Sequence, residues 1–205
     1  ATARISRAGF NFFTPRAQAL AYSGRHRFQT AHHTMSLLPD TTDAATRADR
    51  QAQVLAALGA HLPADALLWH REDVTPYECD GLTAYRQRPL VVALPETEAQ
   101  VAAVLKACHR LGVPVVARGA GTGLSGGALP HAMGVTLSLA RFNQILRVDP
   151  ISRTAVVQCG VRNLAISEAA APFGLYYAPD PSSQIACTIG GNVAENSGGV
   201  HCLKY

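Results

Sequence analysis

The spacing of apolar and polar positions predicts a first regular element after a long polar amino-terminal stretch. In "AATRADRQAQVLAALG" (44–59) the aliphatic residues recur at helical spacing, which predicts an amphipathic helix that ends at Gly59. Either Thr41 or Thr42 is placed to cap this helix. A polar loop is expected over roughly 70–88.

Two short apolar runs then flank a helical pattern. "LVVAL" (90–94) and "VPVVA" (113–117) are typical of buried strands. Between them, Thr97 and Gln100 form a capping box for a helix that Gly112 ends. Strands joined by a crossover helix run parallel, so we expect one parallel β-α-β unit.

The remaining pattern is mainly antiparallel. "GVTLSL" (134–139) predicts a further strand, residues 143–160 a hairpin around the turn "PISR", and residues 162–174 a helix. The rest of the chain has mostly loop chemistry. The expected fold class is α+β, with a small parallel β-α-β subdomain followed by a second, mainly antiparallel α+β subdomain that is incomplete at the carboxyl terminus.

Composition and charge exclude several classes of protein. With 205 residues and 48% apolar content, the chain is long and apolar enough to fold around one substantial core or two small ones. Five of the 18 Lys and Arg precede Asp40, which leaves 13 against 14 acidic residues in the remainder. The basic character therefore belongs to a leader, and we exclude nucleic acid as a partner.

The leader, residues 1–35, is expected to be disordered and to carry no function. It is rich in Arg and lacks acids, which fits a mitochondrial transit peptide, but Met35 also fits a true initiator and an ordinary tail is a third reading. We expect residues 36–88 to form a helical segment and loop, and residues 89–205 a ligand-binding domain.

The cysteine pattern and the hydropathy of the sequence indicate the cellular compartment of the protein. The five cysteines are widely spaced and include no C-x-x-C pair, so we expect reduced thiols rather than a disulfide framework or a zinc site. No apolar run reaches the length of a membrane span. The sequence predicts a soluble protein in a cytoplasmic type of compartment.

The stretch "ARGAGTGLSGG" (117–127) imitates three known motifs and fits none of them. A Rossmann fingerprint needs a crossover helix, and only residues 128–135 separate its last glycine from the next strand. A nucleophile elbow needs its serine at a strand-to-helix turn, which Ser125 does not occupy. A Walker loop needs Lys and Ser or Thr after the glycines. What remains is a backbone that can curl around an anion, so we expect a phosphate cradle.

A second glycine cluster, "GGNVAENSGG" (190–199), follows "PDPSS" (179–183). Two polar, glycine-rich stretches separated by strands and a helix predict a long ligand with distinct ends, such as a dinucleotide. With "LPETEAQVAAVLKACHRLGVPVVARGAGTGLSGGAL", "YAPDPSS" and "CTIGGNVAENSGG" in this order and spacing, the sequence resembles flavoproteins whose FAD-binding domain is of the p-cresol methylhydroxylase and vanillyl-alcohol oxidase (PCMH/VAO) type. Within that group it looks closest to the FAD-linked subunits of bacterial glycolate oxidases, and next to D-lactate and D-2-hydroxyglutarate dehydrogenases.

This resemblance implies FAD as the cofactor and a set of residues that contact it. The residues that would wrap the pyrophosphate are Arg118, Gly119, Gly121, Thr122, Gly123, Leu124, Ser125, Gly126 and Gly127. Those that would lie along the cofactor toward the flavin are Pro179, Asp180 and Ser183. Those that would line the remaining cofactor surface are Thr188, Gly190, Gly191, Asn192, Asn196 and Gly198.

The resemblance also implies oxidation of a small 2-hydroxy acid, glycolate or D-lactate, with hydride transfer to flavin N5 and electrons passed to a respiratory acceptor or to companion flavoprotein and iron-sulfur subunits. The catalytic base and any metal would lie beyond Tyr205, so we assign no catalytic or metal-binding residue and expect an N-terminal fragment that is inactive alone. His201 and Cys202 have no identifiable partner for a chemical role.

Other interpretations stay open at this stage. The chain would be a noncatalytic, truncated nucleotide-binding remnant if no flavin binds, or the FAD domain of another flavin reductase or oxidase, such as one acting on a cell-wall precursor. Two other locations also stay open beside the cytoplasm: a peripheral position at the inner membrane, and the mitochondrion if the leader is a transit peptide.

Overall fold

The computed structural model describes residues 2–4 and 44–203. The predicted cap at Thr41 or Thr42, Met35 and nearly all of the leader lie outside the described residues. Three leader residues are described: Thr2–Arg4 form strand β1, which pairs antiparallel with strand β7, Thr154–Val157. These three residues belong to the leader for which the sequence predicts disorder, and they add to the edge of the sheet at β7.

The first lobe is built on a mixed four-stranded sheet. Its strand order is β2-β3-β5-β4, for Leu67–Leu68, Val91–Ala93, Val135–Ser138 and Val115–Arg118. The expected β-α-β strands β3 and β4 do run parallel, but each pairs with β5, which lies between them. Strand β2 adds to the edge antiparallel, so the segment before residue 89 is part of this sheet.

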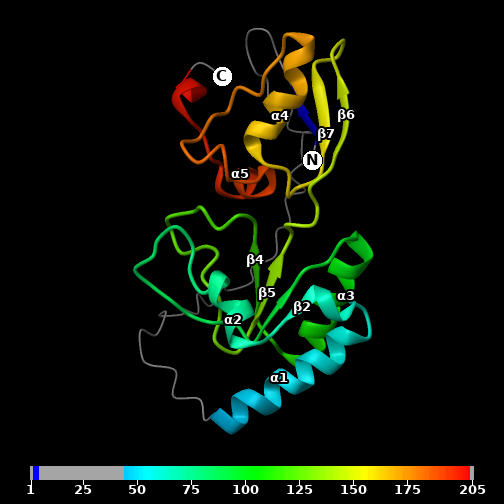
Figure 1. The fold of residues 1–205 in the computed structure, drawn as a ribbon, viewed down its shortest axis with the longest axis vertical. Coiled ribbons are helices and arrows are strands. Elements are labelled where there is room, and N and C mark those ends of the chain that lie inside the picture. The colour runs from blue at the N-terminus through cyan, green and yellow to red at the C-terminus, as the bar shows by residue number, and fades with distance from the viewer. Residues whose placement is uncertain (1, 5–43, 204–205) are drawn as a thin grey trace, which may run out of the picture.

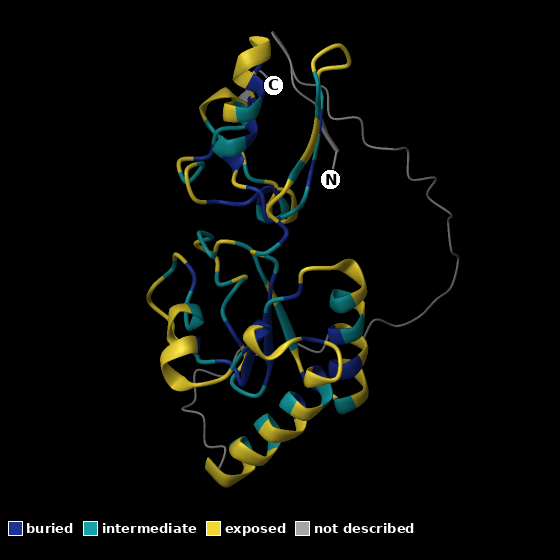
Figure 2. Ribbon diagram, turned by 45° about the vertical axis from the view of Figure 1, so that its right-hand side comes forward, coloured by how far each residue is buried: buried dark blue, intermediate teal, exposed yellow. Residues whose placement is uncertain are grey.

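Two helices cover this sheet. Helix α1, Ala44–Gly59, and helix α3, Glu98–Leu111, contribute their aliphatic faces to one core with the strands. Figure 2 shows the buried side of each helix turned inward and the exposed side outward. The capping box predicted for α3 is present, with both Thr97 and Gln100 side chains bonded to the backbone, and Gly112 ends the helix at φ 62°.

A second lobe follows along the chain (Figure 1). Strands β6, Ile145–Asp149, and β7 form the predicted antiparallel hairpin. Helix α4, Asn163–Ala170, continues as a 3₁₀ turn and ends at Gly174, and packs on the hairpin through a core of its own. The two separate cores confirm the expected division into a mainly parallel and a mainly antiparallel part.

Two stretches that the sequence assigned to loops contain helices. Helix α2, Arg71–Val74, followed by a 3₁₀ turn over Thr75–Tyr77, lies within the expected polar loop. Helix α5, Ile189–Glu195, occupies much of the second glycine cluster, and a 3₁₀ turn over Val200–Leu203 follows. The expectation of loop structure was wrong in both places. In α5, tertiary contacts outweigh the low helix propensity of Gly190 and Gly191.

Candidate functional site

The first glycine stretch leaves the carboxyl end of β4 and lies on the side of the first lobe that faces the second. Gly121 and Gly126 adopt φ values of 72° and 77°, in the region that glycine enters without steric cost. Within the described residues, no atom accepts a hydrogen bond from the backbone N–H groups of Gly121, Thr122 or Gly123. These donors are therefore available to an acceptor outside the protein.

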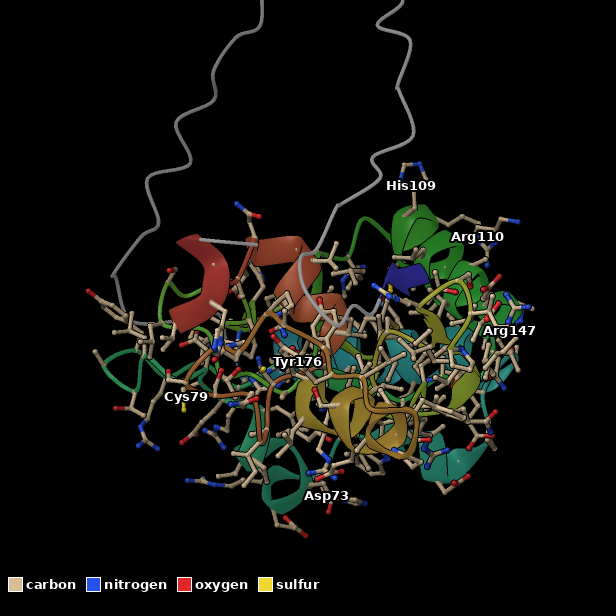
Figure 3. All side chains as sticks on the ribbon, turned by 90° about the horizontal axis from the view of Figure 1, so that it is seen from above. Asp73, Cys79, His109, Arg110, Arg147 and Tyr176 are labelled. Atoms are coloured by element: carbon tan, nitrogen blue, oxygen red, sulfur yellow. The ribbon has the colours of Figure 1, made fainter. Side chains whose placement is uncertain are left out.

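The segment Tyr77–Gly81, which we call the strap, packs against the first glycine stretch. The Arg118 guanidinium donates to the Cys79 carbonyl over 2.7 Å and lies 5.5 Å from the centroid of the Tyr77 ring. Figure 3 shows Cys79 at the periphery of the molecule. Gly81 approaches so closely that a Cβ on it would lie 2.8 Å from the Thr122 carbonyl oxygen. The strap thus fixes the glycine stretch, a contact that no local pattern in the sequence indicated.

Helix α5 brings the second glycine cluster toward the first. A Cβ on Gly190 would lie 2.8 Å from Cys159 Cβ, so the helix rests directly on the chain that follows β7. Asn196 ends the helix in the left-handed region at φ 53°, a conformation that asparagine tolerates better than most residues. The asparagine at this position therefore has a local conformational cause, the end of the helix.

The Asn192 side chain is buried and held in place. Its Nδ2 donates to Asn163 Oδ1 over 2.9 Å, and Asn163 Nδ2 in turn donates to the Pro179 carbonyl over 3.0 Å. Asn163 is fully buried. This chain of hydrogen bonds ties α5 to α4 and to the segment that begins at Pro179.

The two clusters meet at Gly119 and Thr188. A Cβ on Gly119 would lie 2.5 Å from Thr188 Oγ1 and 4.0 Å from the Gly191 nitrogen. Thr188 Oγ1 is buried and has no hydrogen-bond partner among the described residues. A buried hydroxyl without a partner costs about 1–3 kcal/mol of folding free energy, so this atom, too, is suited to a ligand.

Between the lobes lies a cleft of about 730 Å³, a volume in the range of about 300–1,000 Å³ that is usual for small-molecule and cofactor sites. It brings together most of the residues that the sequence singled out. Those that line it are Arg118, Gly119, Gly121, Thr122, Gly123, Gly127, Ser183, Thr188, Gly190, Gly191 and Asn192.

The other predicted residues do not line the cleft. They are Leu124, Ser125, Gly126, Pro179, Asp180, Asn196 and Gly198. Several of them support the structure nearby: a Cβ on Gly198 would lie 2.5 Å from Cys202 Sγ, and the Asp180 carboxylate accepts from the His201 backbone and contacts its ring over 2.8 Å. Burial raises the pKa of Asp180, but the hydrogen bonds from His201 outweigh it, and the pKa lies below its usual value.

Sequence reasoning missed further cleft residues. The wall includes apolar side chains of β4 and two cysteines, together with Glu195 at the end of α5; the set is Val115, Val116, Ala117, Ala120, Ala128, Leu139, Cys159, Cys187, Ala194, Glu195 and Ser197. Burial raises the pKa of the Cys159 thiol, so it is less readily ionised. Only the position of the glycine stretch after β4 signalled that side chains of this strand would face a ligand.

Comparison with known proteins agrees with this arrangement. Residues 89–205 match the FAD binding domain family. Over 155 residues the chain is 66% identical to the glycolate oxidase subunit GlcD of Escherichia coli (strain K12), covering 76% of this chain and 31% of that protein. It is 40% identical over 144 residues to a D-lactate dehydrogenase of Archaeoglobus fulgidus and 37% identical over 144 residues to a D-2-hydroxyglutarate dehydrogenase of Xanthomonas citri, each covering 70% of this chain and 30% of the relative.

The chain therefore spans about a third of the length of the curated relatives it matches. Among solved structures, p-cresol methylhydroxylase with substrate bound has a TM-score of 0.62 at 21% identity, covering 79% of this chain and 32% of that one. Within residues 2–4 and 44–203, no helix has the length and apolar character to cross a membrane. The fold, the two glycine clusters and the match over residues 89–205 together show that the chain belongs to the FAD binding domain family.

Proposed function

We propose that the chain forms the FAD-binding part of a flavin-dependent oxidoreductase that acts on a small 2-hydroxy acid. The similar proteins carry the names glycolate oxidase, D-lactate dehydrogenase and D-2-hydroxyglutarate dehydrogenase. Glycolate, D-lactate and 2-hydroxyglutarate share a carboxylate next to a carbon that bears a hydroxyl. This common group supports the substrate class, with glycolate first because GlcD is similar at 66% identity.

The observation that carries the proposal is the cleft with unpaired donors on both of its sides. Gly121, Thr122 and Gly123 offer backbone N–H groups that no group in the described part of the chain accepts from, and Thr188 offers a buried hydroxyl. Phosphate oxygens accept hydrogen bonds from such groups, and glycine lets them approach the backbone closely. The residues present therefore fit the pyrophosphate of FAD.

The remaining wall suits the rest of the cofactor. Val116 and Leu139 provide apolar surface for a ring system, while Ser183 and Asn192 provide polar groups for hydroxyls. FAD, when bound, supplies the acceptor for the hydride of a 2-hydroxy acid. The residues of this chain bind and orient it.

Companion subunits and a cytoplasmic location complete the proposal. The word subunit in the name of the Escherichia coli relative supports an assembly. The five cysteines are free, which fits a reducing compartment.

FAD binding is tested with the purified 205-residue chain. We expect the flavin absorption bands to stay with the protein after mixing with FAD and desalting, and flavin fluorescence to change on titration. A chain that is folded by circular dichroism but retains no flavin would contradict the proposal and leave a noncatalytic remnant as the better description.

The substrate class is tested in a chimera that joins this chain to the part of Escherichia coli GlcD that follows the matched region. Glycolate or D-lactate, added without oxygen, should bleach the bound flavin. A chimera that binds FAD but is bleached by neither acid would contradict the 2-hydroxy-acid assignment. Glyoxylate and pyruvate, the 2-oxo products, serve as controls that should leave the flavin oxidised.

A further inference from the structure

Two asparagine side chains form a chain of hydrogen bonds that leads from the Pro179 carbonyl to the cleft. Asn163 Nδ2 donates to this carbonyl over 3.0 Å, and Asn192 Nδ2 donates to Asn163 Oδ1 over 2.9 Å. The second bond joins α4 to α5, which lie next to each other in the second lobe (Figure 1). Asn163 is fully buried, whereas Asn192 is 7% exposed and lines the cleft. Of the two, only Asn192 can therefore reach a ligand.

The Pro179 carbonyl fixes the direction of both amides. A carbonyl only accepts hydrogen bonds, so Asn163 has to turn its NH₂ group toward it and its oxygen toward Asn192. That oxygen is an acceptor too, so Asn192 has to donate to it through its own NH₂ group. A flip of either amide would place like groups against each other in a buried site, which leaves hydrogen bonds unmade.

The oxygen of the Asn192 amide is left for a ligand. Within residues 2–4 and 44–203, no group donates to Asn192 Oδ1, and unlike Thr188 Oγ1 this atom is not sealed from solvent. Because Asn163 holds the NH₂ side of the amide, the cleft meets a group that only accepts hydrogen bonds. Such an oxygen binds O–H and N–H groups and not phosphate oxygens, which are acceptors themselves.

We infer that Asn163 is a positioning residue, which holds the Asn192 amide so that the cleft presents an acceptor to an O–H or N–H group of the bound cofactor. In FAD this donor is a hydroxyl of the ribityl chain or the N3–H of the flavin ring. The inference rests on the proposed FAD site and adds to it the kind of cofactor group that lies at Asn192. Asn163 acts through Asn192, because its own side chain is fully buried.

The test compares FAD with analogues that each lack one donor. Three of them lack a single ribityl hydroxyl, and a fourth is methylated at N3. Dissociation constants are measured by flavin fluorescence with the full 205-residue chain, and each is divided by that of FAD. We expect one analogue to bind the wild type about two- to tenfold more weakly than FAD, the size of one hydrogen bond. Its identity shows whether the donor is a hydroxyl or the ring N–H.

Three variants show whether this ratio depends on the hydrogen bond between the two asparagines. N192A removes the acceptor, and N163A lets the Asn192 amide turn its NH₂ group to the cleft, so the ratio should fall close to unity in both. N163D keeps an oxygen for Asn192 Nδ2 but cannot donate to the Pro179 carbonyl. It should therefore be less stable in thermal unfolding and still keep the wild-type ratio.

S167A is the matched control. Ser167 also lies in α4 and also holds the chain just before Pro179, because its Oγ accepts from the Tyr177 backbone N–H over 2.9 Å. It forms no hydrogen bond with Asn192 and does not line the cleft. S167A should lose stability and keep the wild-type ratio, which separates the direction of the amide from stability in general.

A ratio that stays unchanged in folded N163A, or that falls as far in N163D or S167A, would overturn the inference and leave the FAD site intact. If N163A does not fold, NMR of the ¹⁵N-labelled wild type decides. The Asn192 NH₂ protons should be protected from exchange before FAD is added, and protection that arises only with FAD would overturn the inference. Equal binding of FAD and all four analogues would also overturn it, whereas a wild type that binds no FAD would overturn the proposed function, and this inference with it.

Discussion

The backbone of Gly119 rests against the side chain of Thr188, so closely that a Cβ on the glycine would lie 2.5 Å from Thr188 Oγ1. Gly119 follows β4 in the first lobe and Thr188 precedes α5 beside the second. The contact therefore sets how near the two glycine clusters come to each other. Because both residues line the cleft, it also sets the shape of the candidate site.

Replacement of Gly119 by alanine should weaken FAD binding. The new methyl group meets a buried, β-branched side chain that has little freedom to rotate, and overpacking of this kind costs about 1–3 kcal/mol. We expect a lower melting temperature and an FAD dissociation constant that is several-fold higher by fluorescence titration. G59A is the control, because a Cβ on Gly59 meets nothing within 4 Å.

The double variant G119A/T188A tests whether the clash with Thr188 Oγ1 is the cause of the loss of stability in G119A. It removes Oγ1 and leaves Thr188 Cβ, which lies 3.8 Å from the position of the new methyl group, an ordinary contact. The melting temperature should return most of the way to the wild-type value. If it stays as low as in G119A, the clash is not the cause of the loss.

Replacement of Thr188 by valine should separate folding from binding. Valine keeps the shape and removes the buried hydroxyl that has no partner, so the free energy of unfolding should rise by about 1 kcal/mol. FAD affinity should fall several-fold, because the same hydroxyl is proposed to donate to the cofactor. Urea unfolding and flavin titration provide the two readouts.

T136V is the matched control for this experiment. Thr136 lies in β5 and is fully buried. Its Oγ1 also lacks a partner within residues 2–4 and 44–203, but it does not line the cleft. It should gain stability as T188V does and keep the wild-type FAD affinity. An equal loss of FAD affinity in both variants would show that Thr188 has no particular part in binding.

Local signals in the sequence predicted the elements whose causes are local. The capping box of Thr97 and Gln100 and the left-handed end at Gly112 place α3 correctly, and the run after Pro89 gives a buried strand. The order of the sheet was beyond such signals, because the position of β5 between β3 and β4 depends on pairing between distant segments. Periodicity indicates which face of a strand is buried, but it does not identify the strand that lies beside it.

The candidate site shows the same division. Glycine content revealed the first stretch, but helix α5 was missed because Gly190 and Gly191 lower the helix propensity of its first turn. Gly190 is explained by its contact with Cys159, 31 residues earlier in the chain. Glu195 and the strap were missed for a related reason, since a charged residue or a tyrosine carries no local mark of a distant contact.

Replacement of Gly81 in the strap by alanine should displace the backbone of the first glycine stretch. The new Cβ would meet two backbone oxygens, of Thr122 at 2.8 Å and of Gly123 at 2.9 Å, and backbone cannot move aside as a flexible side chain does. We expect a loss of stability of about 1–3 kcal/mol and a several-fold rise in the FAD dissociation constant.

The variant R118K tests the contact between the strap and the first glycine stretch from the side of Arg118. Lysine lacks the planar guanidinium that contacts the Cys79 carbonyl and the Tyr77 ring together. It keeps the positive charge, so an unaltered FAD affinity would indicate that charge alone matters at position 118. A loss of affinity that matches G81A would support the strap as the cause.

Stability at alkaline pH should depend on Tyr177. Burial raises the pKa of this phenol from 10.0 to about 12, with smaller contributions from Cys202 and Cys187. Between these two values the unfolded chain has lost the phenol proton while the folded chain still holds it. The unfolded state then binds fewer protons, so the free energy of unfolding falls as the pH rises, by about 1.4 kcal/mol per pH unit at most. Below pH 10 this group adds no pH dependence.

The variant Y177F isolates this effect. Phenylalanine fits the same buried site and cannot ionise, so the loss of stability above pH 10 should be smaller than in the wild type. The free energy of unfolding is measured by urea titration at neutral pH and at several values between 10 and 12. A constant difference between the two proteins across this range would show that the Tyr177 hydroxyl acts through its contacts alone. A difference that changes in favour of Y177F as the pH rises would confirm the raised pKa, because only a titrating group produces it.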